Sequence, residues 1–255
     1  MLSLRLPELK QESQLRFPQD LRLELAETEE QLARRQNESQ RDFALRLNKV
    51  VQQGIAHIDW DNPAMEKYHL RVPPWENYLL YAMSFVRPAD YRKYHFSDPH
   101  LTVERGVGIC GDAACVMSSL LEQEGIETRI LAFPGHVIVE AQLGEATQET
   151  WLLDADFGVA LPLTLAALQS PDRSFAGYYA AAGHDDAEIE VLANIYSKPP
   201  EVFADTFAFS PKRAIFEQTS YVLIWVLPAL LLLAGVLGLR RREATSGNET
   251  SPTKC

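Results

Sequence analysis

The spacing of apolar residues predicts an amphipathic helix in the first half of the chain. Its apolar positions recur at intervals of three and four residues, as on one face of an α-helix, at Phe43, Leu47, Val50 and Val51. We therefore expect a helix over residues 39–55, with Ser39 as its N-terminal cap. Residues 57–74 and 89–105 are expected as loops on either side of a short helix at 75–86.

The middle of the chain is typical of one helix followed by strands. The helix is expected from Gly106 to about Gln123, with Gly125 as its C-terminal stop. Three strands with short turns between them follow over residues 128–133, 136–143 and 150–153. This order predicts an α+β domain in which an antiparallel sheet packs on the helix. Mixed helix and loop over 163–200 are expected to close the domain.

A continuous apolar segment lies near the C-terminus. Residues 221–239 form a run of 19 residues without a charge. As a helix this run would span about 28 Å, close to the thickness of the hydrocarbon core of a bilayer. Tyr221 and Trp225 sit near one end, as interfacial aromatic residues do. We predict a single transmembrane helix over 219–242, followed by a short polar tail over 243–255.

Two signals disagree on which side of the membrane the domain lies. Three arginines at 240–242 outweigh Lys212 and Arg213 before the apolar run, which places the tail in the cytoplasm and the domain outside. The N-terminal residues, however, lack the apolar run of a signal peptide, which favours a tail-anchored protein with a cytosolic domain. Both arrangements stay open, and we favour the outward-facing domain.

Composition and charge narrow the function classes. The chain has 255 residues, of which 46% are hydrophobic and 23% charged, as in globular proteins. Asp and Glu number 35 against 24 Lys and Arg, for a net charge of -11, so no basic face for nucleic acid is expected. The charged residues 1–38 are expected to be helical or flexible, and the folded domain is expected over 39–205.

The cysteines suggest a nucleophile rather than a cross-link. Cys110, Cys115 and Cys255 are too few for a disulfide framework, and no spacing typical of a zinc site occurs. We therefore expect no metal or organic cofactor. Cys110 stands at a helix start between Gly108 and Gly111, where unpaired N–H groups and the helix dipole favour a thiolate. Cys115 is expected to be a packing residue.

A histidine and an aspartate complete a candidate triad. His136 opens a strand after a Pro-Gly turn, where its imidazole can face the helix start. Asp154 ends the next strand, and antiparallel pairing would bring it beside His136. A thiolate nucleophile needs a base, and the base needs an orienting acid. Cys110, His136 and Asp154 are therefore the predicted catalytic residues, with Asp156 as an alternative third member because it has the same strand parity.

The remaining polar residues are given less specific roles. The other histidines are expected in loops or at the surface, at His57, His69, His95, His100 and His184. Arg105 is expected to form a surface salt bridge, with a contact to an anionic substrate group as the alternative. The Cys110 backbone N–H is the only predicted donor to an oxyanion.

Three stretches of the sequence carry a family resemblance: GVGICGDAACVMSSLLEQEGIETRIL, GHVIVEA and WLLDADFG. Together they resemble the transglutaminase-like core of the papain-type thiol enzymes. The resemblance covers about residues 100–160. It implies a papain-like core with N-terminal helices, and the roles of nucleophile, base and orienting acid for Cys110, His136 and Asp154. Val137 and Ala155 depart from the family pattern, which usually has an aromatic residue soon after the histidine and a proline after the aspartate. A transmembrane end is similar to that of transglutaminase-like proteins from bacterial cell envelopes.

Three classes of function follow from these expectations. The first is a membrane-anchored, cysteine-dependent enzyme acting on amide or acyl bonds, as a peptidase, amidase or acyltransferase. Its partners would be the lipid bilayer and a peptide, protein or cell-envelope substrate, with no nucleic acid. The alternative is a non-catalytic transglutaminase-like binding module in a cell-envelope or polysaccharide assembly. A third reading is a membrane-tethered adaptor that uses the helix at 39–55.

Overall fold

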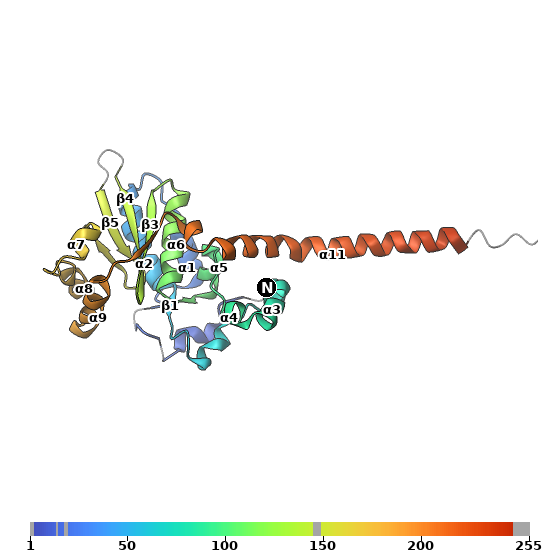
Figure 1. Ribbon diagram of the computed structural model, residues 1–255, viewed down its shortest axis with the longest axis horizontal. Helices are drawn as coiled ribbons and strands as arrows, with labels where there is room; N and C mark the ends of the chain where they lie inside the picture. Colours follow the sequence, from blue (N-terminus) through green and yellow to red (C-terminus); the bar gives the residue numbers. More distant parts are fainter. Residues whose placement is uncertain (1–2, 14, 18–19, 145–148, 247–255) are drawn as a thin grey trace, which may run out of the picture.

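A five-stranded antiparallel sheet lies at the centre of the computed structural model, which describes residues 3–13, 15–17, 20–144 and 149–246. Its strands are ordered β6-β5-β4-β3-β7 (Figure 1). Their bounds are Thr128–Phe133 (β3), His136–Leu143 (β4), Glu149–Asp154 (β5), Val159–Leu161 (β6) and Glu201–Phe203 (β7). A short parallel pair, β1 (Ala56–His57) and β2 (Val107–Gly108), precedes them. The predicted strands and the mixed helix-and-sheet architecture with an antiparallel sheet are confirmed.

Two long helices cover one face of the sheet. These are α2 (Gln40–Gly54) and α6 (Cys110–Gln123), and α1 (Leu25–Leu32) packs on α2. Val139 and Leu153 of the sheet are buried in one cluster with apolar residues of both helices. Each such side chain contributes roughly 1.5–3 kcal/mol by leaving water. The predicted cap of α2 is confirmed, because the Asp42 N–H donates to the Ser39 hydroxyl at 3.0 Å.

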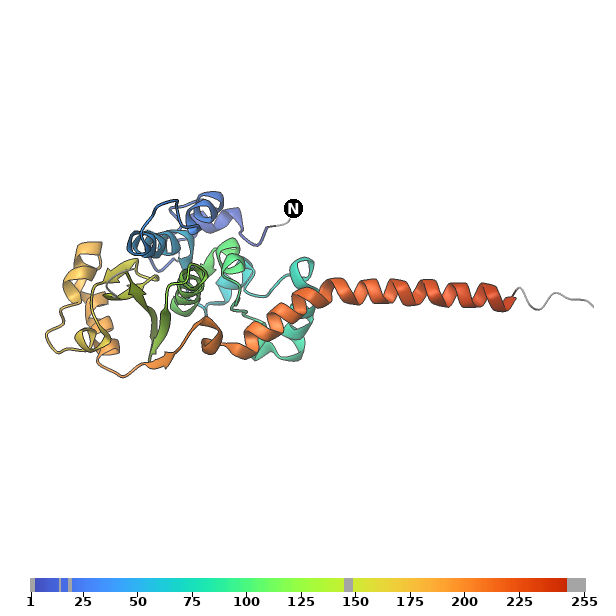
Figure 2. The ribbon, with the colours of Figure 1, turned by 90° about the horizontal axis from the view of Figure 1, so that it is seen from above.

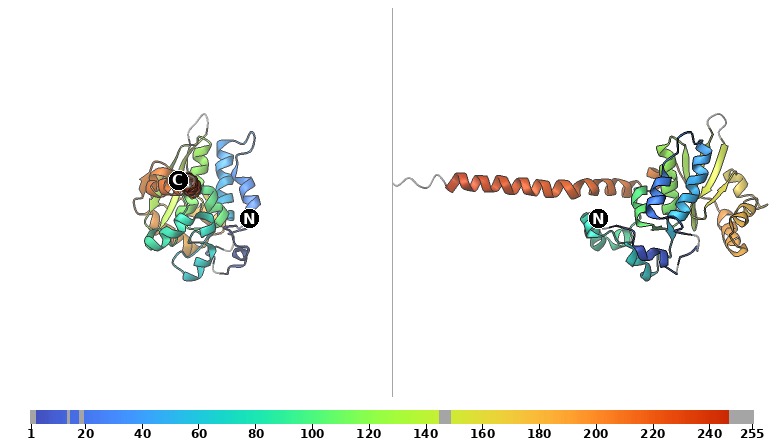
Figure 3. Two further views of the ribbon diagram at one scale, coloured as in Figure 1. Left: turned by 90° about the vertical axis from the view of Figure 1, so that its right-hand side faces the viewer. Right: turned by 180° about the vertical axis from the view of Figure 1, so that it is seen from behind.

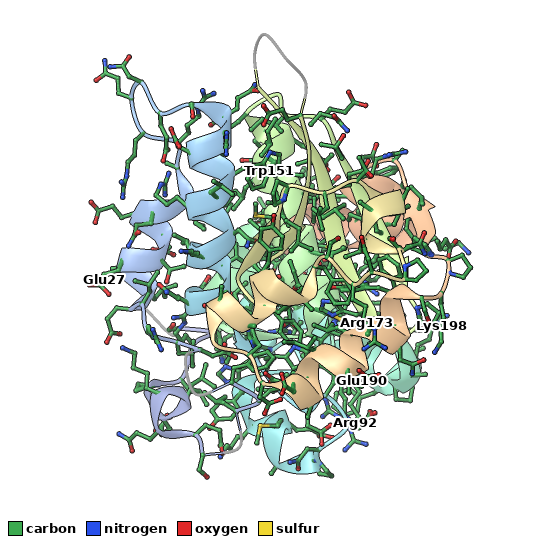
Figure 4. All side chains as sticks on the ribbon, turned by 90° about the vertical axis from the view of Figure 1, so that its left-hand side faces the viewer. Glu27, Arg92, Trp151, Arg173, Glu190 and Lys198 are labelled. Atoms are coloured by element: carbon green, nitrogen blue, oxygen red, sulfur yellow. The ribbon has the colours of Figure 1, made fainter. Side chains whose placement is uncertain are left out.

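The opposite face of the sheet is also buried. Its residues, including Ile138 and Leu152, pack against α7 (Leu165–Leu168), α8 (Ala176–Ala182) and α9 (Asp186–Tyr196). Burial on both faces explains why β4 alternates only partially between apolar and polar residues. At this end of the domain, Arg173 forms an exposed ion pair with Glu190 at 2.6 Å (Figure 4).

The N-terminal residues share the core with the rest of the domain. Besides α1, they contain a short 3-10 helix, Pro7–Gln11. Leu9, Phe17 and Leu32 are almost fully buried, each in a cluster with residues beyond position 39. Apolar residues spaced irregularly among charges give no periodic signal, which is why the sequence pattern set 1–38 apart from the folded domain.

The segment between α2 and α6 is more helical than the sequence indicated. It contains η2 (Pro63–Tyr68), α3 (Pro74–Val86), α4 (Pro88–Tyr91) and α5 (Pro99–Arg105). The loop predicted over 89–105 is therefore wrong at both ends, which belong to α4 and α5, and the loop predicted over 57–74 contains η2. Asp98 accepts a hydrogen bond from the His100 N–H at 2.8 Å, and Pro99 occupies the first helical position, so together they start α5.

One long helix, α11 (Pro211–Ser246), follows the four-residue α10 (Thr206–Phe209) and projects from the domain as a rod (Figure 2). Among the described residues, one helix is long and apolar enough to cross a membrane, and its candidate span is Pro211–Leu237. The predicted anchor at 219–242 falls inside α11, which begins earlier, at Pro211, and packs on α3 through residues that include Ser220 and Tyr221. Residues 243–246 of the predicted tail belong to the end of α11, and the rest of the tail, from residue 247 onward, lies outside the described residues.

Candidate active site

Cys110 lies in the first turn of α6, as predicted, but the helix begins at Cys110 and not at Gly106, because Gly106 ends α5 and Val107–Gly108 form β2. Ile109 precedes it in an extended conformation, and the Ile109 N–H donates to Asp112 Oδ2 at 2.9 Å. Gly108 is required at this turn, because a Cβ there would come within 2.8 Å of Asp112 Cβ. The Cys110 side chain is partly exposed. The thiol is therefore accessible at a helix end where backbone N–H groups lack helical acceptors.

The start of α6 lies against the start of β4. A methyl group added at Gly111 would come within 4.0 Å of Val137 Cγ2, and Val137 directly follows His136. The Cys110 thiol also interacts with the His136 ring, since it is one of the groups that raise the pKa of that histidine. The structure thus brings Cys110 and His136 together at one end of the sheet.

His136 is held at the tip of a tight hairpin. Phe133 of β3 pairs with His136 of β4, so Pro134 and Gly135 alone form the turn, and Gly135 adopts a φ of 104° that favours glycine. The side chain of His136 is buried, and its Nε2 donates to Asp154 Oδ2 at 2.8 Å. This hydrogen bond leaves Nδ1 as the ring nitrogen available to Cys110.

Asp154 is fully buried and accepts several hydrogen bonds besides that of His136. Tyr179 donates to its Oδ2 at 2.6 Å, and Tyr196 lies 3.3 Å from the same oxygen. The backbone N–H of Phe157 donates to Oδ1 at 3.1 Å. Neither tyrosine was predicted from the sequence, because both lie in helices beyond the stretches that carry the resemblance and no motif spacing marks them.

The pKa shifts of His136 and Asp154 favour a charged imidazolium beside a carboxylate. Burial disfavours the charged form of His136, but the charge and hydrogen bond of Asp154, together with Cys110, outweigh it and raise the pKa of His136 well above its usual value. Burial likewise opposes ionisation of Asp154, but His136 and Tyr179 hold the pKa of Asp154 below its usual value. An imidazolium held by a carboxylate is the arrangement that stabilises a neighbouring thiolate.

Asp156 points to a different partner. Its Oδ1 lies 2.6 Å from His57 Nδ1, and its Oδ2 accepts from Arg16 at 3.3 Å. The contacts of the two aspartates therefore place Asp154, and not Asp156, against His136. His57 was predicted in a loop or at the surface, whereas it forms part of β1 and of this polar cluster.

Cys115 lies one turn further along α6. Burial and the charge of Asp112 raise the pKa of the Cys115 thiol to about 12. It is therefore protonated at neutral pH and fits the predicted role of a packing residue.

Asp112 organises a second polar cluster beside Cys110. Its carboxylate accepts from His95 Nδ1 at 2.9 Å, and the His95 ring stacks on Trp60 with centroids 4.3 Å apart. Arg105 was predicted at the surface, but it is fully buried and donates to the backbone carbonyls of Tyr94 and Val107. The surface salt bridge expected for Arg105 is therefore wrong: the arginine is drawn inside because it satisfies main-chain carbonyls of the loops around α5.

A cleft of about 710 Å³ adjoins the start of α6. Two of its lining residues contact the first turn of α6. His95 bonds Asp112, and Phe209 lies within 3.9 Å of a methyl group built on Gly111. The remaining walls come from α4, the loop before α5 and the first turn of α11.

The site was also compared with metal-binding arrangements, and the chain with known proteins. Within the described parts of the chain, no group of three or more His, Cys, Asp and Glu side chains is arranged to hold a metal ion. Comparison with protein-family models, curated proteins and solved structures found no match to this chain. Function is therefore inferred from the residues of the site.

Proposed function

We propose that the protein is a membrane-anchored, cysteine-dependent enzyme that acts on amide or acyl bonds, with Cys110 as nucleophile, His136 as base and Asp154 as orienting acid. The observation that carries this proposal is the buried 2.8 Å hydrogen bond between His136 Nε2 and Asp154 Oδ2, beside a helix that begins at Cys110. The resemblance of residues 100–160 to transglutaminase-like enzymes supports the same assignment.

The reaction follows from these roles. The Cys110 proton resides on His136 Nδ1, so the site holds a thiolate beside an imidazolium, and the thiolate Sγ attacks the carbonyl carbon of the substrate. The resulting oxyanion accepts a hydrogen bond from the Cys110 backbone N–H. His136 then returns the proton to the leaving amine as the C–N bond breaks, which leaves a thioester on Cys110. Water or a second amine gives a proton to His136 and attacks the thioester, which releases the acyl group and restores the thiolate beside the imidazolium.

Asp154 serves this cycle without touching the substrate. Its carboxylate holds Nε2, so Nδ1 of the same ring stays directed to the nucleophile. Tyr179 and the Phe157 N–H fix the carboxylate in turn. The substrate would enter through the cleft beside His95 and Phe209, and a peptide, protein or cell-envelope amide at the membrane surface fits the anchored domain.

An acyl-transfer burst tests the proposal. Full-length protein in detergent is mixed with p-nitrophenyl acetate, and nitrophenolate release is followed together with the mass of each cysteine-containing peptide. We expect a burst equal to the protein concentration and a hydroxylamine-sensitive acetyl group on Cys110. Cys115→Ala should keep the burst, and His136→Ala should lose it. Equal acetylation of Cys110 in wild type and in His136→Ala would argue instead for a binding module without turnover.

A further inference from the structure

Helix α3 carries an apolar face that stays largely exposed in the described structure. Asn77 breaks the helical conformation near its start (φ -151°, ψ 99°), and its Oδ1 accepts from the N–H groups of Leu79 and Leu80, so it caps the helix that follows. Beyond this cap, the exposed residues recur at helical spacing, at Tyr78, Ala82, Phe85 and Val86. Phe85 and Val86 are 60% and 71% exposed.

The same helix is attached to α11 where the apolar span begins to leave the domain. Asn77 Nδ2 donates to the Ser220 hydroxyl at 2.9 Å, and Tyr221 donates to Glu76 at 2.8 Å. Tyr78 reaches the Ile224 carbonyl at 3.4 Å. From residue 225 onward, where Trp225 is 76% exposed, α11 has no large buried side chain in its described part.

Both views of the molecule place α3 on the side from which α11 departs. In Figure 1 and in the right panel of Figure 3, α3 lies at this edge of the domain, beside the first turns of α11. The opposite end of the domain presents charged side chains such as Arg173, Glu190 and Lys198 (Figure 4). The apolar face of α3 therefore lies next to the point where α11 would enter a bilayer.

The chemistry of the patch fits a membrane interface. Residues 78–86 contain no charged side chain, whereas the Arg71 guanidinium lies 4.8 Å from the centre of the Phe85 ring at the edge of the patch. Tyrosine and tryptophan favour the headgroup level of a bilayer, and a flanking arginine suits anionic headgroups. Tyr78, Tyr221 and Trp225 together would form such an aromatic belt on two helices.

We propose that the face of α3 formed by Tyr78, Ala82, Phe85 and Val86 lies in the interfacial layer of the bilayer as a second membrane contact beside α11. This inference rests on α11 crossing a membrane and is independent of catalysis. Two contacts fix the tilt of the domain. Because Arg87 after α3 and Arg213 of α11 both line the cleft next to α6, the cleft would lie close to the membrane surface, where a membrane-bound substrate could reach it.

Collision accessibility of a spin label tests this contact in the full chain. Cys110→Ser, Cys115→Ala and Cys255→Ser remove the native thiols, and a nitroxide is attached to one new cysteine at a time: Phe85→Cys, Val86→Cys, Val191→Cys or Leu231→Cys. All four sites are at least half exposed, so labelling leaves the core intact. The protein is reconstituted into vesicles of phosphatidylcholine and phosphatidylglycerol. The accessibility of the label to oxygen, which concentrates in lipid, is compared with its accessibility to a water-soluble nickel complex, and the two are expressed as an oxygen-to-nickel ratio.

We expect the oxygen-to-nickel ratio at positions 85 and 86 to exceed that at position 191 of α9 by several-fold and to stay below that at position 231, which lies near the middle of the apolar run of α11. A ratio at 85 and 86 equal to that at 191 overturns the inference. Low accessibility to both reagents at 85 and 86 also overturns it, because that result means the face is covered by a second copy of the chain. A water-like ratio at 231 shows instead that α11 does not cross the bilayer, and the contact falls with it.

Discussion

His136 and Asp154 meet diagonally across two antiparallel strands rather than directly opposite each other. The register pairs Val139 with Leu153, and continuing it by one residue sets Ile138 opposite Asp154. Continued to His136, the same register reaches position 156. The chain leaves β5 at Asp154, however, and turns over 155–158 before β6. Asp156 is therefore carried away from the sheet toward His57, and Asp154 reaches back to His136 at 2.8 Å.

This geometry predicts different effects for the two aspartates. Asp154→Asn should lower the rate of the nitrophenyl ester reaction by about 10²–10⁴-fold, because the carboxylate no longer stabilises the imidazolium. Asp156→Asn, the matched control, should change the rate only slightly. Burst and steady-state rates of both variants, measured alongside circular dichroism, check the assignment. If Asp156→Asn is the damaging change, the orienting acid is Asp156.

The tyrosine pair predicts a stability difference between neighbouring residues. Tyr179→Phe removes the donor that bonds Asp154 at 2.6 Å and contacts the Tyr196 hydroxyl at 2.7 Å. It should lower the free energy of unfolding by about 1–3 kcal/mol, because a buried carboxylate loses one hydrogen bond. Tyr178→Phe changes an adjacent, partly exposed tyrosine and should stay within about 0.5 kcal/mol of wild type. Denaturant titrations in detergent measure both; equal losses would contradict the assigned role of Tyr179.

Local patterns predicted the elements that carry the site, and long-range packing decided the rest. The helix beginning at Cys110 and the strand beginning at His136 were visible because each has its own turn residues and apolar periodicity. The choice between Asp154 and Asp156 could not be predicted from the sequence. Both residues would lie on the same face of a continuing strand, and only the position at which the strand ends separates them. Arg105 was misplaced for a related reason: it is buried because the carbonyls of Tyr94 and Val107 accept its hydrogen bonds, and the pattern of apolar residues does not show which carbonyls a loop turns inward.

The two cysteines of α6 should differ strongly in reactivity. Cys110 lies partly exposed beside His136, whose raised pKa keeps the imidazole charged near neutral pH. The thiol of Cys115, with its pKa raised to about 12, stays protonated. Iodoacetamide below neutral pH should therefore modify Cys110 much faster than Cys115, and faster than Cys255, which lies outside the described residues. Peptide mass spectrometry over time measures the rates, and the difference should vanish in denaturant. A similar rate at Cys115 in the folded protein would contradict the choice of Cys110.

Asp20 predicts a dependence of stability on pH. Burial, together with the charge of Asp156, raises the pKa of Asp20 to about 7, although the His57 N–H donates to its carboxylate at 2.9 Å. The folded state therefore holds a proton that the unfolded state releases above about pH 4. The stabilising contribution of Asp20 is complete below that pH and is lost as pH rises through about 7.

Asp20→Asn should remove this part of the pH dependence, because the amide does not titrate. Unfolding free energies of wild type and variant are compared between pH 4 and pH 8 by denaturant titration. The exposed Glu201→Gln is the control and should follow the wild-type curve. An Asp20→Asn curve parallel to wild type across this range would show that Asp20 is ionised throughout.

The contacts between α3 and α11 predict where the anchor can be cut. A chain ending at Ile224 keeps Ser220 and Tyr221, which bond Asn77 and Glu76, and removes the exposed part of α11. This truncated chain should be extractable without detergent and should unfold at the same temperature as the full chain. A chain ending at Gln218 loses both contacts, leaves the buried Asn77 amide without its partner, and should unfold at a lower temperature.

Sedimentation with membranes separates the anchor from the weaker contact proposed for α3. An apolar helix face with a flanking arginine binds reversibly, so the chain ending at Ile224 should leave the membranes in a high-salt or carbonate wash, whereas the full chain should stay. Adding Phe85→Glu to the shorter chain should abolish its residual binding to anionic vesicles without altering its unfolding temperature, since Phe85 is 60% exposed. If the shorter chain instead still sediments after the wash, the membrane attachment lies elsewhere than α11.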